Sequence, residues 1–213
     1  MDVRSRVLAG VARQLGHPQG VVGRLVGAGL NRGNGRAVEA AVDAASVVAG
    51  ASVADLGFGG GVGLSLLLDR VGPSGTVHGV EVSEEMLLAA RRRHSAAVAT
   101  GRLVLHRASL DRLPLPETSL DGLVTTNTVY FLDDLTQVFA EMARVLAPSG
   151  SAVVGIGDPE AMAKLPFTGY GFRLRAVDDV LASARAAGLE LRSHERVGDG
   201  ARPFHILALG PTH

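Results

Sequence analysis

The stretch Val53-Ala54-Asp55-Leu56-Gly57-Phe58-Gly59-Gly60-Gly61-Val62-Gly63 decides the fold of this chain. A short apolar run ends at an aspartate and opens into a glycine-dense turn, and an apolar helical stretch follows. Glycine lets the backbone approach a ligand that a Cβ would exclude, and the free N–H groups at a helix start would face that ligand. The pattern therefore predicts a strand, a tight turn and a helix around a small nucleoside-like molecule; a glycine-rich turn with no ligand is the alternative.

The spacing of these glycines argues against two other nucleotide motifs. A dinucleotide fingerprint, G-x-G-x-x-G/A, needs glycine or alanine at Val62 when counted from Gly57 and at Leu64 when counted from Gly59. No Lys-Ser/Thr follows the glycines, so a P-loop fails as well. A nicotinamide-dependent reductase is left as a rival that titration with NADH would test.

Composition bounds the class of protein. A chain of 213 residues is long enough to bury one core and is expected to be a single domain. Its formal net charge of zero gives no general argument for nucleic-acid binding. The absence of cysteine excludes disulfides, thiolate metal sites and thiol nucleophiles. Neither a secretory signal nor an apolar run of membrane-spanning length is visible, so we expect a cytoplasmic protein.

From about residue 50 onward, strand-like and helix-like segments alternate. This predicts an α/β fold, a Rossmann-like doubly wound sheet that is mostly parallel, with helices on both faces. We expect strands over 52–57, 76–81, 102–107, 120–126, 151–157, 189–197 and 203–210, and helices over 62–71, 83–99, 134–146 and 177–187. The glycines of Gly198-Asp199-Gly200 predict a C-terminal antiparallel hairpin. Residues 1–50, with a helix over 36–48, are expected to form an N-terminal helical cap on the ligand-binding domain, 51–213.

Four ordered motifs together resemble those of class I S-adenosylmethionine-dependent methyltransferases. The first is D-x-G-x-G-x-G at Asp55, Gly57, Gly59 and Gly61, and the second is Val77-His78-Gly79-Val80-Glu81-Val82-Ser83. The third lies in 107–121, where Leu113-Pro114, Pro116, Ser119 and Asp121 match G-D-A-x-x-L-P-F-P-D-x-S-F-D. The fourth, Glu141-Met142-Ala143-Arg144-Val145-Leu146-Ala147-Pro148-Ser149-Gly150, is similar to E-x-x-R-V-L-x-P-G-G. The N-terminal residues and the turn after the first strand also resemble a small bacterial subgroup that is loosely similar to quinone C-methyltransferases.

The resemblance implies S-adenosyl-L-methionine as cofactor and S-adenosyl-L-homocysteine as product. Glu81 would accept hydrogen bonds from both ribose hydroxyls, because a carboxylate accepts two donors at once. Ser109 replaces the family's acidic residue, so its contact with the adenine amino group would be weaker, while the N–H of Leu110 could still bond to the ring. The expected cofactor-binding residues are Asp55, Gly57, Gly59, Gly61, Glu81, Val82, Met86, Ser109, Leu110, Asn127 and Thr128.

The acceptor side is less well defined by the sequence. The expected substrate-binding residues are Asn34, Tyr130, Phe131 and Tyr170, and the candidate catalytic residues are His17 and Tyr130. No histidines pair at metal-ligand spacing, so no metal is expected, and His78 and His106 are read as structural. The absence of cysteine argues against an arsenite methyltransferase.

The expected reaction is in-line methyl transfer to O or C of a small, apolar or aromatic acceptor, natural-product-like or quinone-like. A lipid-headgroup methyltransferase with some membrane contact, and a repurposed S-adenosylmethionine-binding protein that does not methylate, are the alternatives. The expected partner is a small molecule and not a nucleic acid, and the chain is expected to be a monomer or a homodimer.

Overall fold

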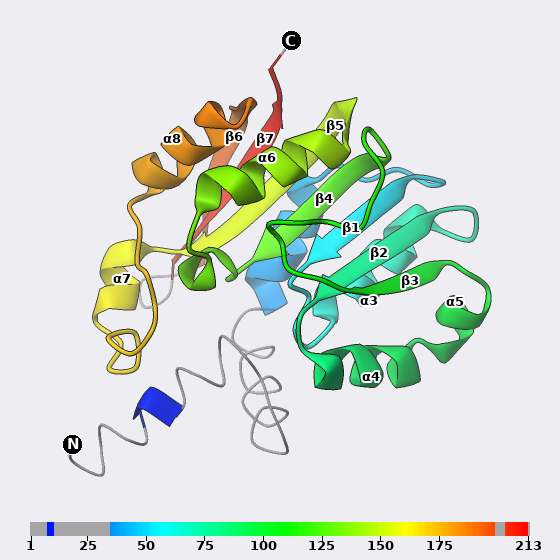
Figure 1. The fold of residues 1–213 in the computed structure, drawn as a ribbon, viewed down its shortest axis with the longest axis horizontal. Coiled ribbons are helices and arrows are strands. Elements are labelled where there is room, and N and C mark those ends of the chain that lie inside the picture. Colours follow the sequence, from blue (N-terminus) through cyan, green and yellow to red (C-terminus); the bar gives the residue numbers. More distant parts are fainter. Residues whose placement is uncertain (1–7, 11–34, 199–202, 213) are drawn as a thin grey trace.

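The computed structural model describes residues 8–10, 35–198 and 203–212, and these build one seven-stranded sheet in the order β3-β2-β1-β4-β5-β7-β6 (Figure 1). The strands are β1 (Ser52–Leu56), β2 (Thr76–Glu81), β3 (Leu103–Arg107), β4 (Leu120–Thr126), β5 (Leu146–Gly157), β6 (Leu189–Val197) and β7 (Phe204–Pro211). The pairings among β1 to β5 are parallel, and β7 is antiparallel to both β5 and β6. The predicted mostly parallel sheet with a C-terminal antiparallel hairpin is confirmed.

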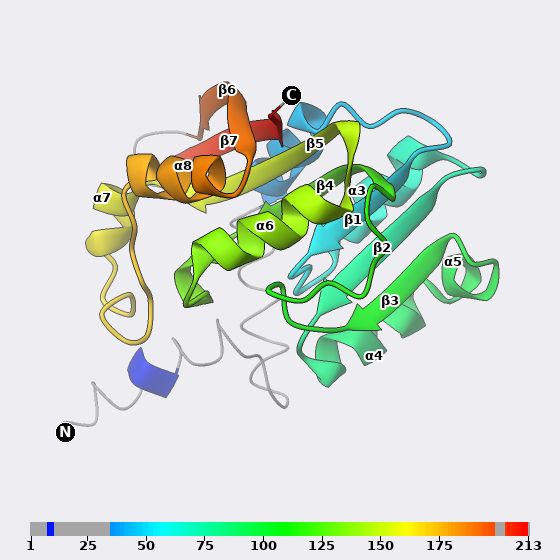
Figure 2. The same cartoon turned by 45° about the horizontal axis from the view of Figure 1, so that its top comes forward.

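Helices cover both faces of this sheet (Figures 1 and 2). They are a helix over 35–44, α3 (Val62–Val71), α4 (Glu84–Arg93), α5 (Ser95–Ala99), α6 (Leu135–Val145), α7 (Pro159–Ala163) and α8 (Val177–Ala186), with a short 3-10 helix, η1 (Val129–Phe131). The helix over 35–44, α3 and α4 lie on one face, and α6 and α8 lie on the other. None of the described helices is both long and apolar enough to cross a membrane.

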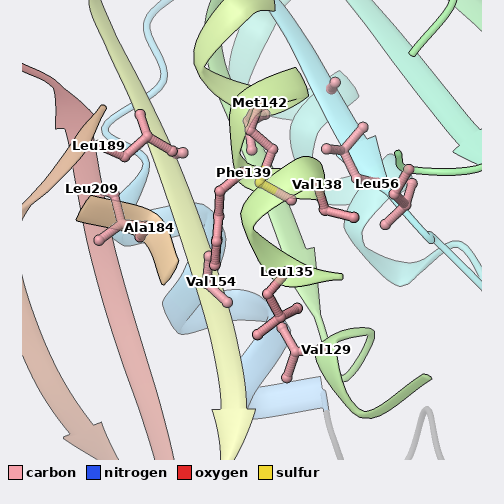
Figure 3. Packing of buried hydrophobic residues seen from close by; sticks show 14 of the residues in the cluster. Leu56, Val129, Leu135, Val138, Phe139, Met142, Val154, Ala184, Leu189 and Leu209 are labelled. Atoms are coloured by element: carbon pink, nitrogen blue, oxygen red, sulfur yellow. The ribbon is translucent and has the colours of Figure 1, made fainter. Parts of the chain in front are cut away.

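Helix α6 supplies the centre of the larger core cluster. Its buried residues recur at the spacing of one helical face, so they pack together against β4 and β5 (Figure 3); they are Leu135, Val138, Phe139, Met142 and Val145. The helix begins at Asp134, whose side chain accepts a hydrogen bond from the N–H of Gln137 at 3.1 Å. It ends at Leu146, where the backbone becomes extended and enters β5 directly.

The opposite face is covered in part by the helix over 35–44. Ala41 and Val42 of this helix are fully buried, in one cluster with Leu64 and Leu67 of α3 and Val53 of β1. The helix ends at residue 44, earlier than the predicted 48. The other segments of the expected N-terminal cap, residues 1–7 and 11–34, lie outside the described residues, so the cap stays a prediction.

Three features differ from the predicted elements. The helix expected over 83–99 is two helices, because the chain breaks at His94, which caps both. Strand β5 begins at Leu146 instead of residue 151, because Leu146 pairs with Leu120 across an irregularity in the register. The short elements η1 and α7 were not expected, since three and five residues carry too little periodicity to be recognised.

The strand order positions the site. From β1 the chain winds outward through β2 to β3, then crosses to the other side of β1 and forms β4. The connections that follow β1 and β4 therefore leave the sheet in opposite directions. Open α/β sheets bind their ligands at such a point, in the crevice outside the carboxyl ends of the strands. Asp55 lies near the carboxyl end of β1, Glu81 at that of β2, and Asn127 directly after β4.

Candidate active site

The turn between β1 and α3 is shaped by contacts that only glycine permits. Gly57, Gly59 and Gly61 have φ values of 70°, 48° and 76°, in the left-handed region that other residues rarely adopt. At Gly57 a Cβ would stand 2.4 Å from the Cγ2 of Thr128. The first glycine therefore brings β1 and the segment after β4 into direct contact, which is a role the sequence pattern alone did not indicate.

Asp55 is a buried carboxylate at the end of β1. It is only 5% exposed, and within the described part of the chain no group donates a hydrogen bond to it. Burial, with a further contribution from nearby Glu81, raises the pKa of Asp55 to about 7. A buried carboxylate is costly to keep ionised, so this position is suited to a ligand that brings a cationic group.

Glu81 lies at the end of β2 and is also buried, at 7% exposure. Its Oε1 accepts hydrogen bonds from the N–H groups of Val82 and Ser83 at 2.8 and 2.9 Å, and its Oε2 accepts from Gly59 at 3.0 Å. These bonds tie the glycine turn to the end of β2 and fix the carboxylate in place. Three of the roughly four acceptor positions of the carboxylate are thereby used, and Oε2 keeps one for a hydroxyl of a ligand.

The segment after β3 runs beside the segment after β2. The N–H of Ala108 donates to the carbonyl oxygen of Glu81 at 3.3 Å, which continues the alignment of the two strands. Leu110 is buried, and its side chain reaches the neighbourhood of Gly57. Ser109 is exposed. The structure therefore brings Ser109 and Leu110 to the same end of the sheet as Glu81.

Two other expected cofactor residues follow Glu81. Val82 is 39% exposed, whereas Met86 is 4% exposed and packs with the core on the α3 and α4 side. Ser83 caps α4, because its hydroxyl accepts a hydrogen bond from the N–H of Met86 at 3.4 Å. Val82 thus offers an apolar surface at the strand end, while Met86 is part of the core.

The end of β4 holds Asn127 in a strained conformation. Its φ is 59°, a region that asparagine tolerates better than most residues, and its N–H donates to the carbonyl oxygen of Gly155 at 2.9 Å. Just before it, the buried hydroxyl of Thr125 donates to the carbonyl oxygen of Leu56 at 2.9 Å and lies 2.6 Å from the hydroxyl of Thr128. Asn127 and Thr128 are therefore held against β1, close to the glycine turn.

Tyr130 lies in η1 and is 3% exposed. Its phenol oxygen accepts a hydrogen bond from the N–H of Gly157 and donates to Oδ1 of Asn127 at 3.4 Å. Burial raises the pKa of Tyr130 above its ordinary value, so the phenol stays protonated at neutral pH. The hydroxyl therefore joins the ends of β4 and β5; its catalytic role stays a prediction.

Aromatic rings gather beside these strand ends. Phe172 is their centre, with ring centroids 4.7 Å from Phe131, 5.6 Å from Tyr130 and 5.7 Å from Phe167. Tyr130 and Phe131 meet edge to face at 6.1 Å. We call these four residues the aromatic wall. Phe167 and Phe172 were missed by the sequence reasoning, although their closeness to Tyr170 in the chain was a signal that could have found them.

Hydrogen bonds to backbone carbonyl oxygens attach the loop after α7 to η1. The N–H of Arg173 donates to the carbonyl oxygen of Tyr130 at 2.9 Å. The guanidinium of Arg175 donates to the carbonyl oxygens of Val129 and Leu132, the latter at 2.6 Å. The loop that carries Phe167, Tyr170 and Phe172 is thereby fixed to η1, which no local sequence pattern indicated.

Four predicted residues remain: His17, Asn34, His78 and His106. His17 and Asn34 lie outside the described residues. The rings of His78 and His106 stack with centroids 5.4 Å apart, and their Nδ1 and Nε2 atoms are 3.1 Å apart. In the described ranges, no three metal-ligating side chains come together.

Comparison with known proteins identifies the family. A family model described as a methyltransferase domain matches residues 54–154. The uncharacterised methyltransferase YdaC of Bacillus subtilis (strain 168) is 32% identical over 146 residues, which cover 68% of this chain and 74% of that protein. The chain belongs to the class I S-adenosylmethionine-dependent methyltransferases. This confirms the expected family, the enzyme class of the domain and S-adenosylmethionine as its cofactor.

Other curated relatives match smaller parts of their own length. An uncharacterised 37.1 kDa protein of transposon TN4556 from Streptomyces fradiae is 36% identical over 121 residues, or 57% of this chain, and the match spans only 34% of that relative's length. Nocamycin O-methyltransferase of Saccharothrix syringae is 30% identical over 158 residues, covering 73% of this chain and 54% of that protein. The C-methyltransferase UbiE of ubiquinone and menaquinone biosynthesis from Geobacter sulfurreducens is 29% identical over 105 residues, with 49% and 41% coverage.

Solved structures show the same methyltransferase fold. A geranyl diphosphate methyltransferase in complex with S-adenosylmethionine superposes with a TM-score of 0.73 at 16% identity, covering 93% of this chain and 94% of that one. The [4+2]-cyclase SpnF superposes with a TM-score of 0.70 at 18% identity, with coverage of 84% and 81%. At these identities the likeness concerns the fold alone.

Proposed function

We propose that this chain transfers the methyl group of S-adenosylmethionine to oxygen or carbon of a small, apolar or aromatic molecule. The observation that carries the proposal is the aromatic wall. Four rings pack together beside the end of β4, where Tyr130 is hydrogen-bonded to Asn127. Aromatic side chains bury flat, apolar surfaces and offer no charge to a polar group, so the wall suits a flat or apolar acceptor.

The residues of the site fit the cofactor. Glu81, already fixed by backbone N–H groups, would accept hydrogen bonds from the ribose hydroxyls. The buried carboxylate of Asp55 would face the cationic amino group of the methionine part. When bound, S-adenosylmethionine supplies a methyl group activated by its sulfonium. The main task of the protein is then to hold and orient the acceptor, which by itself accounts for a large share of methyl-transfer rates.

No strong base is needed for an acceptor that ionises readily, such as a phenol or an enol. Tyr130 does not provide one at neutral pH, because burial raises its pKa and its hydroxyl is already hydrogen-bonded. We assign it to the wall and to the positioning of Asn127. A base from the undescribed N-terminal segment, with His17 as the candidate, completes the proposal for acceptors that must lose a proton.

The test is a methyl-transfer assay with S-adenosylmethionine labelled on the methyl group. A panel of phenols, quinols and enols is compared with amines, carboxylates and a phospholipid, and S-adenosylhomocysteine is quantified together with the labelled product. The proposal expects turnover in the first group and none in the second. Turnover confined to amines or to the phospholipid would refute the acceptor class while leaving the methyltransferase assignment intact.

A second candidate is a binder of S-adenosylmethionine that does not methylate. The same fold occurs in a solved structure named as a [4+2]-cyclase, so the fold by itself does not separate the two candidates. The two candidates make different predictions. A repurposed protein would bind S-adenosylhomocysteine tightly, yet would form none from S-adenosylmethionine with any acceptor of the panel.

A further inference from the structure

The fourth sequence motif has a structural role that the cofactor contacts do not explain. Glu141 and Arg144 belong to it and lie on α6, which packs on the α8 side of the sheet. The two side chains are bonded to each other, with Arg144 Nε 2.7 Å from Oε1 and Nη2 2.8 Å from Oε2 of Glu141. This is a two-point pairing of a planar guanidinium with a carboxylate, a geometry that arginine provides and lysine does not.

The same pair also holds the backbone of the segment after β3. The N–H of Leu113 donates to Oε2 of Glu141 at 2.7 Å. Arg144 donates to the carbonyl oxygens of Leu113 and Leu115 at 3.1 and 3.0 Å. These are backbone groups of an irregular segment with no strand or helix to satisfy them. We call the two residues the Glu141–Arg144 clamp.

The clamped segment is short and fixed at both ends. Its start is aligned with β2 through the bond from Ala108 to the carbonyl oxygen of Glu81, at 3.3 Å. Its end is held by the clamp, and Leu110, Leu113 and Leu115 are buried in the core beside α6. Ser109 and Leu110, the residues expected at the adenine, lie between these two anchors. A displacement of the clamped end would therefore move them relative to Glu81.

We propose that the Glu141–Arg144 clamp is a positioning device for adenine recognition, because it sets the place of the Leu110 N–H and the Ser109 side chain against the base. The proposal rests on the proposed function, since it takes the site to bind S-adenosylmethionine. On this proposal, the E-x-x-R motif and the Leu113-Pro114 motif together position the residues that contact the adenine. The hydrogen bond from Arg144 also holds the pKa of Glu141 below its usual range, so the clamp stays ionised well into the acidic range.

The test compares two ligands in Glu141→Gln and Arg144→Lys. The first ligand is S-adenosylhomocysteine. The second is S-inosylhomocysteine, in which the amino group of the base is replaced by a carbonyl oxygen and the adjacent ring nitrogen carries a proton. Calorimetry gives the affinity ratio of the two. We expect the variants to lose about tenfold in affinity for S-adenosylhomocysteine and less for the inosyl analogue, so that the ratio falls.

Hydrogen–deuterium exchange of the unliganded protein gives a readout that needs no cofactor. We expect faster exchange in peptides covering 108–115 of both variants, with peptides of β1 and β5 unchanged. Asp43→Asn is the matched control, because it breaks the surface pair of Asp43 with Arg70, far from this segment in the fold. That control should leave both the ratio and the exchange of 108–115 as in the wild type.

The outcomes separate this inference from the proposed function. Folded variants with an unchanged affinity ratio, or with unchanged exchange over 108–115, would show that the clamp only stabilises the fold, and would overturn the inference. Arg144→Lys keeps the charge and most of the stem, so it tests the two-point geometry even if Glu141→Gln proves unstable. If the wild type binds neither ligand, the proposed function fails, whatever the exchange data show.

Discussion

The carboxylate of Asp55 lies directly against the backbone of Gly63, with no space for a methyl group between them. A Cβ at Gly63 would stand 2.2 Å from Oδ2 and 3.0 Å from Cγ of Asp55. Gly63 is the second residue of α3, so the charge of Asp55 is placed at the positive end of this helix. Gly63, two residues beyond the last glycine of the motif, thus makes room for the side chain of the acidic residue with which the motif begins.

We predict that Gly63→Ala weakens cofactor binding and lowers stability. The new methyl would push the Asp55 carboxylate out of its position, at a cost of about 1–3 kcal/mol. Calorimetric titration with S-adenosylhomocysteine and a thermal melt would measure both effects. Gly35→Ala is the control, because that glycine is helical and no atom of the described residues lies within 4 Å of the added Cβ. Equal affinities for S-adenosylhomocysteine and equal melting temperatures in the two variants would show that the contact between Gly63 and Asp55 is not needed.

The raised pKa of Asp55 predicts a pH dependence of stability in the unliganded protein. Between the ordinary pKa of 3.8 and about 7, the native state binds a proton that the unfolded state has released, so stability falls as pH rises through this range. Asp55→Asn should remove this slope and stabilise the unliganded protein at pH 8 by up to about 4 kcal/mol. Melts at pH 5 and pH 8 measure it, and a wild-type slope retained in the variant would assign the effect to another group.

The same residue predicts that S-adenosylhomocysteine binds more weakly at acidic pH. Protonated Asp55 cannot pair with the cationic amino group of the ligand, so affinity should fall as pH drops below 7, by at most about tenfold per pH unit. In Asp55→Asn the affinity should be low at pH 8 and nearly constant down to pH 5.5. Calorimetry at pH 5.5, 6.5 and 8 distinguishes the two profiles. A wild-type profile that is flat would place the amino group elsewhere.

Glu81→Gln should reduce the affinity for S-adenosylhomocysteine by about 10- to 100-fold. Three backbone N–H groups converge on the two carboxylate oxygens, and an amide offers only one oxygen, so one N–H loses its acceptor and the charge assistance to ribose is lost. Glu84→Gln is the control, because the Glu84 side chain is 68% exposed in a surface pair with Arg107. Unchanged affinity in Glu81→Gln would reject the ribose assignment.

Phe172→Leu should raise the KM for the acceptor several-fold and leave the Kd for S-adenosylhomocysteine within about twofold. The substitution removes the ring that contacts Tyr130, Phe131 and Phe167. Phe139→Leu serves as a comparison, since Phe139 lies on the buried face of α6, is 1% exposed, and its substitution should lower stability without a change in KM. If Phe172→Leu changes only the Kd for S-adenosylhomocysteine, the wall belongs to the cofactor and not to the acceptor.

The parts of the fold that the sequence predicted are those with a strong local pattern. Strands such as Thr76–Glu81 and Leu120–Thr126 match the prediction residue for residue, because each is a short segment rich in β-branched and apolar residues that follows turn residues. Helix α3 matches for the same reason. Helices of five residues or fewer, such as α7, were beyond reach, since one turn shows no periodicity.

The parts of the site that were missed depend on contacts between distant residues. Glu141 meets Leu113 across 28 positions, and Arg175 meets Val129 across 46. Nothing in the local sequence of either partner reveals such a pairing. The E-x-x-R motif was noticed as a resemblance, but its physical role required the structure. Phe172 was likewise invisible as a wall residue until the loop was placed on η1.

The loop that carries Phe167 and Phe172 is attached to carbonyl oxygens of residues 129–132. Substitutions that change the acceptor can therefore occur separately from substitutions that change the scaffold. Arg173 and Arg175 bind carbonyl oxygens, which every residue possesses, so the frame of the wall survives exchange of the side chains at positions 129–132. The rings at 167, 170 and 172 can therefore be replaced without rebuilding the scaffold. A lineage could acquire a new acceptor by a few exchanges on this loop while the cofactor half stays constant, which makes these three positions the first choice for a library that redirects the enzyme.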